Sequence, residues 1–381
     1  MTEKILQVLN KNKIPILSFY SGGGFMDMGF EKAGFEIVWT NEVDEVFAKL
    51  YEAGITSWRK ERGNGIKAEI FNKKSITEVS TENIIKEAFP DGKPQEFGII
   101  GGPPCQDFSM NGKLKGFDGE RGKLTVVFFD KILELQPTFF VMENVTGLTK
   151  SKSTKDHLNK LLNRVEEEYL IDHNTLNALD FGVPQYRERV FFIGILKKKL
   201  NEKFVNKSIC QWFDFPLNEK YYGSAKKYQW SIAVEFGRKL KKPKDIPVEL
   251  CVENCLVSKQ KINTTPNAKE YFNLYVDVKE LMKIGEGETN RPSFKRLHRY
   301  KYSPTACYGN NEVHLHPYEN RRLSVRETLR IQGVEESYIL PENLPLSKKF
   351  KMIGNGVPVP LAEAVANAVK DFLQINNIIH I

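Results

Sequence analysis

Short apolar runs alternate with amphipathic stretches along the first half of this chain of 381 residues. Stretches with helical spacing, such as residues 26–32, lie between runs of strand length. The runs of strand length are residues 16–19, 35–39, 97–100, 139–142 and 190–195. Strands that alternate with helices are typical of a parallel α/β sheet. We therefore predict an α/β fold that binds ligands at the carboxyl ends of its strands.

Composition narrows the class of protein. Apolar residues make up 41% and charged residues 27% of a chain long enough for a large core and two domains. The sequence shows no apolar signal segment and no run long enough to span a bilayer. Its five cysteines are odd in number and widely spaced, and Cys251 and Cys255 have no second pair that would complete a zinc site. We expect a cytoplasmic protein without metal or membrane contact.

The net charge of +8 is concentrated in one segment. Residues 197–301 contain 23 Lys and Arg against 12 Asp and Glu, a balance of +11, so the remaining chain carries −3. Aromatic residues from Trp212 to Trp230 are interspersed with the lysines, and the strand–helix periodicity is lost. This composition suits a polyanion such as nucleic acid, although a solvated lysine-rich face has the same composition.

A regular helical pattern returns near the C-terminus. One helical face carries four apolar side chains, and Pro358 fits the first turn. These side chains are Leu361, Val365, Val369 and Phe372. We therefore predict a first domain, an inserted basic domain and a C-terminal helix that returns to the first domain.

The strand at residues 16–19 leads into the turn SGGG at residues 21–24. Glycines let a turn approach a ligand closely and open the next helix N-terminus toward it. Glu42 follows Gly22 by twenty residues, at the end of the second strand, where a carboxylate can accept both hydroxyls of a ribose. Because the chain lacks both G-x-G-x-x-G and a Walker lysine, a nucleoside without phosphates fits best. A purely structural turn is the alternative.

The sequence GGPPCQDFS at residues 101–109 directly follows the strand at residues 97–100. Two glycines and two prolines predict a stiff turn that presents Cys105 at the carboxyl edge of the sheet. A thiol there can be a nucleophile if its pKa is lowered, or it can be a small buried side chain. This turn by itself does not separate the two interpretations.

Three further polar residues are expected at the same edge. Glu143 comes directly after the strand at residues 139–142, where partial burial would raise its pKa and let it hold a proton near neutral pH. Arg187 and Arg189 lie two apart, so on an extended chain they face the same side. They could present guanidinium groups to a phosphate or a base carbonyl. Each of the three could also be an ion-pair or capping residue.

Together these motifs resemble the cytosine-5 DNA methyltransferases of the prokaryotic, S-adenosylmethionine-dependent type, in that family's order and over nearly the whole chain. The resemblance is carried by residues 19–24, 101–109, 143–145, 185–189, 322–327 with 332–333, and 354–358. It implies a Rossmann-like S-adenosylmethionine-dependent methyltransferase fold with a smaller inserted target-recognition domain. The catalytic and cofactor-binding domain would span residues 1–197, the target-recognition domain 198–344, and the returning C-terminal segment 345–381.

The resemblance also implies which residues form the site. The catalytic residues would be Cys105, Glu143, Arg187 and Arg189. The cofactor S-adenosyl-L-methionine, released as S-adenosyl-L-homocysteine, would be bound by Phe19, Ser21, Gly22, Gly23, Gly24, Glu42, Val43, Ile76, Pro104, Leu124, Asn355 and Val357. Contacts with DNA would come from Gln106, Ser109, Arg121, Gln185 and Arg322. Where the family often has Asp-Ile at the end of its third strand, in contact with the adenine, the nearest match in this chain is Ser75-Ile76.

The implied reaction is methylation of carbon 5 of a cytosine that is flipped out of duplex DNA. Cys105 would add to carbon 6, Glu143 would support ring N3, and Arg189 would hold the base O2. Arg187 would support the loop or a phosphate. The segment at residues 109–122 would close over the base as a lid.

The implied partner is double-stranded DNA, bound by a monomer, with a separate cognate restriction endonuclease as a further possibility. Three alternatives are open: a tRNA methyltransferase of the same family, a non-catalytic DNA-binding relative, and a nicotinamide dehydrogenase. The basic insert favours duplex DNA over tRNA, and the presence of Cys105 and Glu143 favours catalysis. The absence of G-x-G-x-x-G argues against the dehydrogenase. The recognised DNA sequence does not follow from these residues, because base readout depends on the placement of a few side chains.

Overall fold

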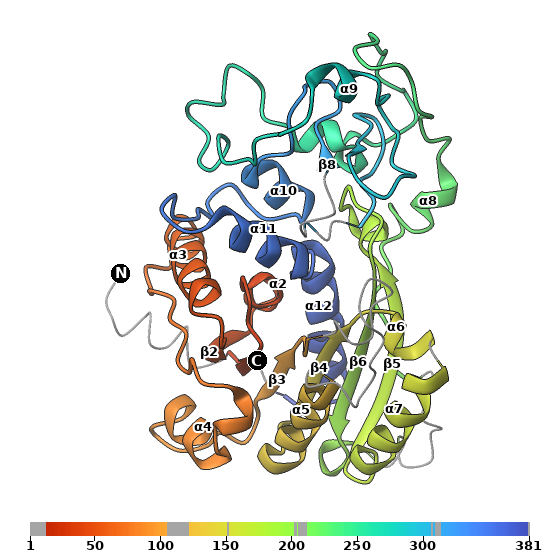
Figure 1. The fold of residues 1–381 in the computed structure, drawn as a ribbon. Helices are drawn as coiled ribbons and strands as arrows, with labels where there is room; N and C mark the ends of the chain where they lie inside the picture. Colours follow the sequence, from red (N-terminus) through yellow and green to blue (C-terminus); the bar gives the residue numbers. More distant parts are fainter. Residues whose placement is uncertain are drawn as a thin grey trace.

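A six-stranded sheet lies at the centre of the larger part of the molecule (Figure 1). The structure is a computed structural model that describes residues 13–104, 122–150, 152–201, 204, 212–305, 308 and 314–379. Neighbouring strands follow the order β2-β1-β3-β4-β6-β5. They are β1 (Pro15–Phe19), β2 (Glu36–Asn41), β3 (Gly98–Gly101), β4 (Phe139–Asn144), β5 (Tyr169–Asn177) and β6 (Glu188–Leu196). The five predicted strands are thus confirmed, and β5 is additional.

The first four strands of this order run parallel, whereas β6 runs antiparallel to both β4 and β5. The parallel pairing that is typical of strand–helix alternation is thus found for β2, β1, β3 and β4, whereas this edge of the sheet is antiparallel. Only residues 178–187 join β5 to β6, and a parallel pairing needs a crossover of a dozen or more residues. Because β6 is antiparallel to β4, its amino end lies beside the carboxyl end of β4. The carboxyl ends of β1, β3 and β4 and the amino end of β6 therefore lie at the same edge of the sheet.

Helices cover both faces of the sheet, because successive side chains of a strand point to opposite faces and both faces are apolar here. Ile16 and Val141 face one core, which also contains apolar side chains of α2 (Phe25–Lys32) and α12 (Val359–Ile375). Their neighbours Leu17 and Phe140 face the other core. That core is covered by α4 (Thr81–Ala88), α5 (Gly122–Leu135) and α7 (Lys152–Val165). The predicted C-terminal helix is confirmed as α12.

A third core joins α3 (Glu45–Glu61) to two helices that follow the basic segment, α10 (Val325–Ile331) and α11 (Leu346–Asn355). Short elements complete the larger part: η1 (Ile76–Glu78), α6 (Gly147–Lys150), η3 (Ala178–Phe181) and η4 (Lys197–Lys199). Within the described ranges, every helix is too short or too polar to span a bilayer.

The smaller part of the molecule gathers at one end, beyond α10 and α11 (Figure 1). Arg296 holds its loops together: the fully buried guanidinium donates to the carbonyls of Leu281 and Ile284 at 2.8 Å and of His316 at 2.9 Å. Such a hub can order irregular loops where the apolar core is small. The described regular elements are short: α8 (Ser224–Lys227), η6 (Val248–Leu250), η7 (Val252–Cys255), α9 (Val278–Met282), β7 (Lys295–Arg296) and β8 (His314–Leu315).

Two aromatic residues of the basic segment pack on the larger part. The rings of Trp212 and Phe213 lie 5.1 and 5.7 Å from the ring of Phe372 in α12. Their backbone N–H groups donate to the Asp172 carboxylate at 2.9 and 3.1 Å. These aromatic side chains therefore belong to the core, although their mixture with lysines suggested a nucleic-acid surface.

Candidate active site

The turn after β1 forms a cradle that only glycine can build. Gly22 and Gly24 adopt left-handed conformations, with φ of 56° and 75°. A Cβ on Gly24 would lie 2.6 Å from the ring of Tyr51, so no other side chain fits there. Gly24 is also the N-cap of α2. The cradle therefore leads directly into a helix N-terminus.

Glu42 is held beside this cradle by backbone donors. Its Oε2 accepts from the Gly22 N–H at 3.0 Å, and its Oε1 accepts from the Asp44 N–H at 2.8 Å. Burial raises the pKa of Glu42, and these hydrogen bonds oppose the rise. Each carboxylate oxygen can accept a further hydrogen bond, so the group can receive the two hydroxyls of a ribose. The adjacent Val43 is 60% exposed and offers an apolar surface next to it.

Two aromatic residues precede the turn, and the structure separates them. Phe19, predicted to bind the cofactor, is 1% exposed and packs edge-on against Trp39 and Phe128 in the core. Tyr20 is half-buried, has a φ of 57°, and donates its hydroxyl to the Leu124 carbonyl at 2.9 Å. A left-handed aromatic residue is uncommon and often marks a functional turn. Tyr20 is thus the aromatic side chain beside the cradle, which sequence reasoning missed.

Residues from the C-terminal part of the chain pack against the cradle. A Cβ on Gly23 would lie 3.0 Å from the Met352 sulfur, and the Tyr338 hydroxyl donates to the Gly23 carbonyl at 2.8 Å. Asn355, at the end of α11, is exposed, and Val357 is buried just after it. Residues far apart in the sequence therefore meet at the glycine turn.

Ile76 is buried at the start of η1 rather than at the end of a strand. In the preceding segment, the described residues form only an isolated bridge, between Asn72 and Asn41 at the end of β2. Ser75, which stands where the family often has Asp, bonds through its hydroxyl to Thr77 at 2.8 Å. The pair Ser75-Ile76 thus lies close in sequence to a segment that meets β2.

Glu143 belongs to β4 itself rather than to the loop after it. Its Oε1 lies 2.8 Å from Nε of Arg189 at the amino end of β6, and the side chain is buried. Burial raises the pKa of Glu143, while the charges of Arg189 and Arg187 oppose the rise. The sheet edge thus holds a carboxyl group with increased proton affinity, in an orientation fixed by an arginine.

The turn after β3 lies directly over this carboxyl group. A Cβ on Gly102 would stand 2.9 Å from Glu143 Oε2, and the Asn144 amide donates to the Pro103 carbonyl at 3.4 Å. Because β3 and β4 are adjacent and parallel, the turn that ends in Pro104 meets the end of β4. The described residues stop at Pro104. The predicted residues Cys105, Gln106, Ser109 and Arg121, and the predicted lid, lie outside the described part of the chain.

Arg187 and Gln185 have internal partners. Arg187 precedes β6, so the strand alternation expected of it and Arg189 does not apply; it donates to the carbonyls of Gly354 and Gly356 at 2.8 and 3.1 Å. The Gln185 amide donates to Gln332 at 3.1 Å. Both side chains are fully buried. Neither side chain therefore offers an exposed group to a phosphate or a base here. This differs from the DNA contact expected of Gln185 and from the phosphate contact that was one of two roles expected of Arg187.

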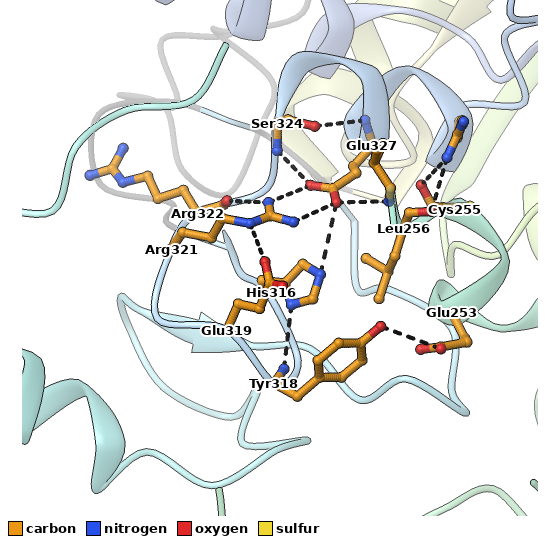
Figure 2. A network of polar contacts seen from close by, with 12 residues as sticks. Glu253, Cys255, Leu256, His316, Tyr318, Glu319, Arg321, Arg322, Ser324 and Glu327 are labelled. Carbon is orange, nitrogen blue, oxygen red and sulfur yellow. Dashed lines mark hydrogen bonds and ion pairs between the residues drawn. The ribbon is translucent and has the colours of Figure 1, made fainter. Parts of the chain in front are cut away.

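The neighbouring residues Arg321 and Arg322 have opposite environments (Figure 2). Arg321 donates to both oxygens of the buried Glu327 at 2.7 and 2.8 Å, and Glu327 forms a capping box with Ser324 at the start of α10. Arg322 points away from this network and lies 5.2 Å over the ring of Phe272. Arg321 is thus a structural link, whereas the half-buried Arg322 has no carboxylate partner among the described residues.

Related proteins are known for nearly the whole chain. The family C-5 cytosine-specific DNA methylase matches residues 14–371. The Type II methyltransferase M.NmeDI of Neisseria meningitidis serogroup C is 38% identical over 371 residues, covering 96% of this chain and 85% of its own. The Type II methyltransferase M.FnuDI of Fusobacterium nucleatum is 31% identical over 363 residues, covering 94% of each. A crystal structure of a candidate DNA modification methyltransferase from an E. coli prophage has a TM-score of 0.65 and 25% identity, covering 95% of this chain and 100% of its own. The chain therefore belongs to the C-5 cytosine-specific DNA methylase family, whose fold is a Rossmann-like α/β methyltransferase fold.

Proposed function

We propose that this enzyme methylates carbon 5 of a cytosine in double-stranded DNA, as a monomer, with S-adenosylmethionine as the methyl donor. The observation that carries the proposal is the buried Glu143–Arg189 pair beneath the Gly102 turn. The Type II names of its relatives support a role in restriction-modification, beside a separate endonuclease.

The cradle after β1 suits S-adenosylmethionine. The Glu42 carboxylate, oriented by two backbone N–H groups, would accept the ribose hydroxyls. The turn is formed by glycines, of which Gly22 is half-buried, and it contains no phosphate-binding lysine. When bound, the cofactor supplies an electrophilic methyl group on a sulfonium. We propose that Tyr20 joins the expected cofactor residues Ser21, Gly22, Gly23, Gly24, Val43, Ile76, Pro104, Leu124, Asn355 and Val357.

Glu143 would bind the flipped cytosine at ring N3. Because burial raises its pKa, the carboxyl group can carry the proton that a strong hydrogen bond to N3 needs. Arg189 keeps the carboxyl group oriented and, in this proposal, turns its remaining donors to the base O2. Arg187 would position the site indirectly, by fixing the Gly354–Gly356 segment.

Cys105 would supply the nucleophile. Its thiolate adds to carbon 6, which breaks the carbon 5–carbon 6 double bond and places electron density on carbon 5. Carbon 5 would then bond to the methyl group as the bond from that group to the sulfonium sulfur breaks and its electron pair stays on the sulfur, which gives S-adenosylhomocysteine. Loss of the carbon 5 proton to a base restores the double bond as the Cys105 sulfur leaves with its electron pair. None of this is geometrically accessible inside a stacked duplex, so the base must be flipped out at a cost of roughly a few kcal/mol.

The smaller part of the molecule, within the expected range 198–344, would form the target-recognition domain, because the excess of +11 at residues 197–301 suits the DNA backbone. Trp212, Phe213 and α10 fall in that range but pack with the larger part. Lysines there would contact phosphates, and a few Arg, Asn, Gln or Thr side chains would read base edges. Arg322 is available for a phosphate, since no described carboxylate neutralises it. Gln106, Ser109 and Arg121 would contact DNA from the catalytic side.

The test uses purified protein, tritium-labelled S-adenosylmethionine, and either plasmid DNA or bulk tRNA. We expect label in DNA but not in tRNA, and less than a few per cent of that label with Cys105→Ala. Label in tRNA alone would replace DNA with tRNA as the substrate. Full activity of Cys105→Ala would overturn the covalent mechanism.

A further inference from the structure

A buried carboxyl group lies beneath the cofactor cradle and takes no part in the proposed chemistry. Asp27, in α2, is 1% exposed. Its Oδ1 accepts from the Ser18 hydroxyl at 2.7 Å, and its Oδ2 accepts from the Tyr51 hydroxyl at 2.8 Å. No ion pair to Asp27 is found among the described residues; Arg59, on α3, pairs with Glu31 instead. Two hydroxyl groups thus take the place of a cationic partner.

The same chain of hydroxyls continues to the cradle. The Ser21 hydroxyl lies 3.0 Å from both the carbonyl oxygen and the hydroxyl oxygen of Ser18. Ser21 is half-buried, and its own backbone N–H donates to the Asn41 carbonyl at 2.9 Å. Asp27 is therefore linked through Ser18 to a side chain at the edge of the turn.

The ionised carboxylate fixes the direction of every hydrogen bond in this chain. A carboxylate can only accept, so Ser18 must give its single hydroxyl hydrogen to Asp27. Ser18 Oγ can then only accept from its other neighbour, so both oxygens of Ser18 that lie 3.0 Å from the Ser21 hydroxyl are acceptors and favour a Ser21 hydrogen that points inward. The lone pairs of Ser21 Oγ are left for the ligand. A ligand group that meets them must be a donor.

We propose that Asp27 is a positioning residue that, through Ser18, favours Ser21 as an acceptor for the ammonium group of the cofactor's amino-acid part. This inference rests on the proposed use of S-adenosylmethionine, whose adenosine end is assigned to Glu42. The amino-acid end carries an ammonium group, a strong donor that matches the free lone pairs. Neutral Asp27 could itself donate, which would release Ser18 and Ser21 to turn their hydrogens toward the ligand.

The state of Asp27 is open to titration. Burial raises its pKa to about 6, and the hydrogen bonds from Ser18 and Tyr51 oppose the rise. Glu31 raises and Arg59 lowers it at longer range, and the Tyr338 ring lies close enough to feel its charge. Its folded pKa lies above its ordinary value, so the charged form lowers stability at pH 7.5 and the neutral form does not. The charged form of Asp27 therefore favours the orientation of Ser18 and Ser21 but lowers the stability of the fold at pH 7.5.

The test measures binding by isothermal titration calorimetry at pH 7.5 without DNA. The ligands are S-adenosylhomocysteine and 5′-methylthioadenosine, which lacks the amino-acid part. We expect Asp27→Asn and Ser21→Ala to weaken S-adenosylhomocysteine about tenfold and to leave 5′-methylthioadenosine unchanged. Glu42→Gln is the control and should weaken both ligands. Thermal unfolding of Asp27→Asn at pH 7.5 should occur at or above the wild-type temperature.

The pH dependence of binding and a second variant test the same role of Asp27. The affinity ratio of the two ligands should fall between pH 7.5 and 5.5 in the wild type and stay constant in Asp27→Asn. If Asp27→Asn does not fold, Tyr51→Phe removes one donor from the carboxylate and should move the midpoint of that fall to higher pH. Equal weakening of both ligands, an unchanged ratio, or a lowered unfolding temperature with normal affinity would make Asp27 a purely structural residue. Wild-type protein that binds neither ligand would overturn the cofactor proposal itself, and this inference with it.

Discussion

Gly102→Ala tests the contact between the cysteine turn and the catalytic carboxyl group. The added Cβ would stand 2.9 Å from Glu143 Oε2, closer than real Cβ contacts, and the same carboxyl group is held by Arg189 at 2.8 Å on its other oxygen. It cannot move away without disturbing that bond. A charge-assisted hydrogen bond is worth about 1.5–3 kcal/mol. We therefore expect the single-turnover rate of methyl transfer to fall roughly 10- to 100-fold, at about 1.4 kcal/mol per factor of ten.

Gly65→Ala is the matched control, because a Cβ there meets nothing within 4 Å. It should keep the wild-type rate. A double-mutant cycle locates the effect: once Glu143→Gln has removed the acid, Gly102→Ala should cost less than about threefold more, since coupled residues are not additive. Additive losses would mean that Gly102 acts elsewhere. A wild-type rate in folded Gly102→Ala would refute the close packing on Glu143.

Three further outcomes are expected. Glu143→Gln should lower the single-turnover rate on the order of 10²-fold with little change in DNA affinity. In the wild type, the single-turnover rate measured on preformed complex should fall as pH rises through the raised pKa of Glu143. The variant should not show this fall in rate with pH. Arg187→Met should lower the unfolding temperature, because the Gly354 carbonyl loses its buried guanidinium donor and the Gly356 carbonyl keeps only the longer hydrogen bond from Gln332. Arg189→Met should affect turnover more than stability. DNA affinity should fall with salt at a log–log slope of about −0.9 per phosphate contact, and a slope near zero would remove the basic segment from the interface.

The local parts of the fold were predictable because local patterns determine them. Apolar runs of strand length predicted the five strands, and glycines before an amphipathic stretch predicted the turn into α2. The distance of twenty residues placed Glu42 beside Gly22, where the structure finds it hydrogen-bonded. These features depend on residues that are close in sequence, or on the rule that an α/β sheet binds ligands at the carboxyl ends of its strands.

The missed features depend on contacts between distant segments. The antiparallel pairing of β6 follows from the short connection after β5, a strand that the sequence did not reveal. Which of Phe19 and Tyr20 lines the turn depends on the pocket that Trp39 and Phe128 make for one of them. Gln185 lost its expected surface role because Gln332, 147 residues away, provides a partner for its amide. A single sequence shows none of these partners.

The central claim is that this enzyme places a methyl group on carbon 5 of cytosine in DNA through Cys105. Plasmid DNA treated with purified protein and S-adenosylmethionine, then digested to nucleosides and measured by mass spectrometry, tests it directly. We predict 5-methylcytosine as the new nucleoside with wild-type protein and none with Cys105→Ala. Methyl groups on cytosine N4 or adenine N6, no methylated nucleoside at all, or 5-methylcytosine from Cys105→Ala would contradict the account.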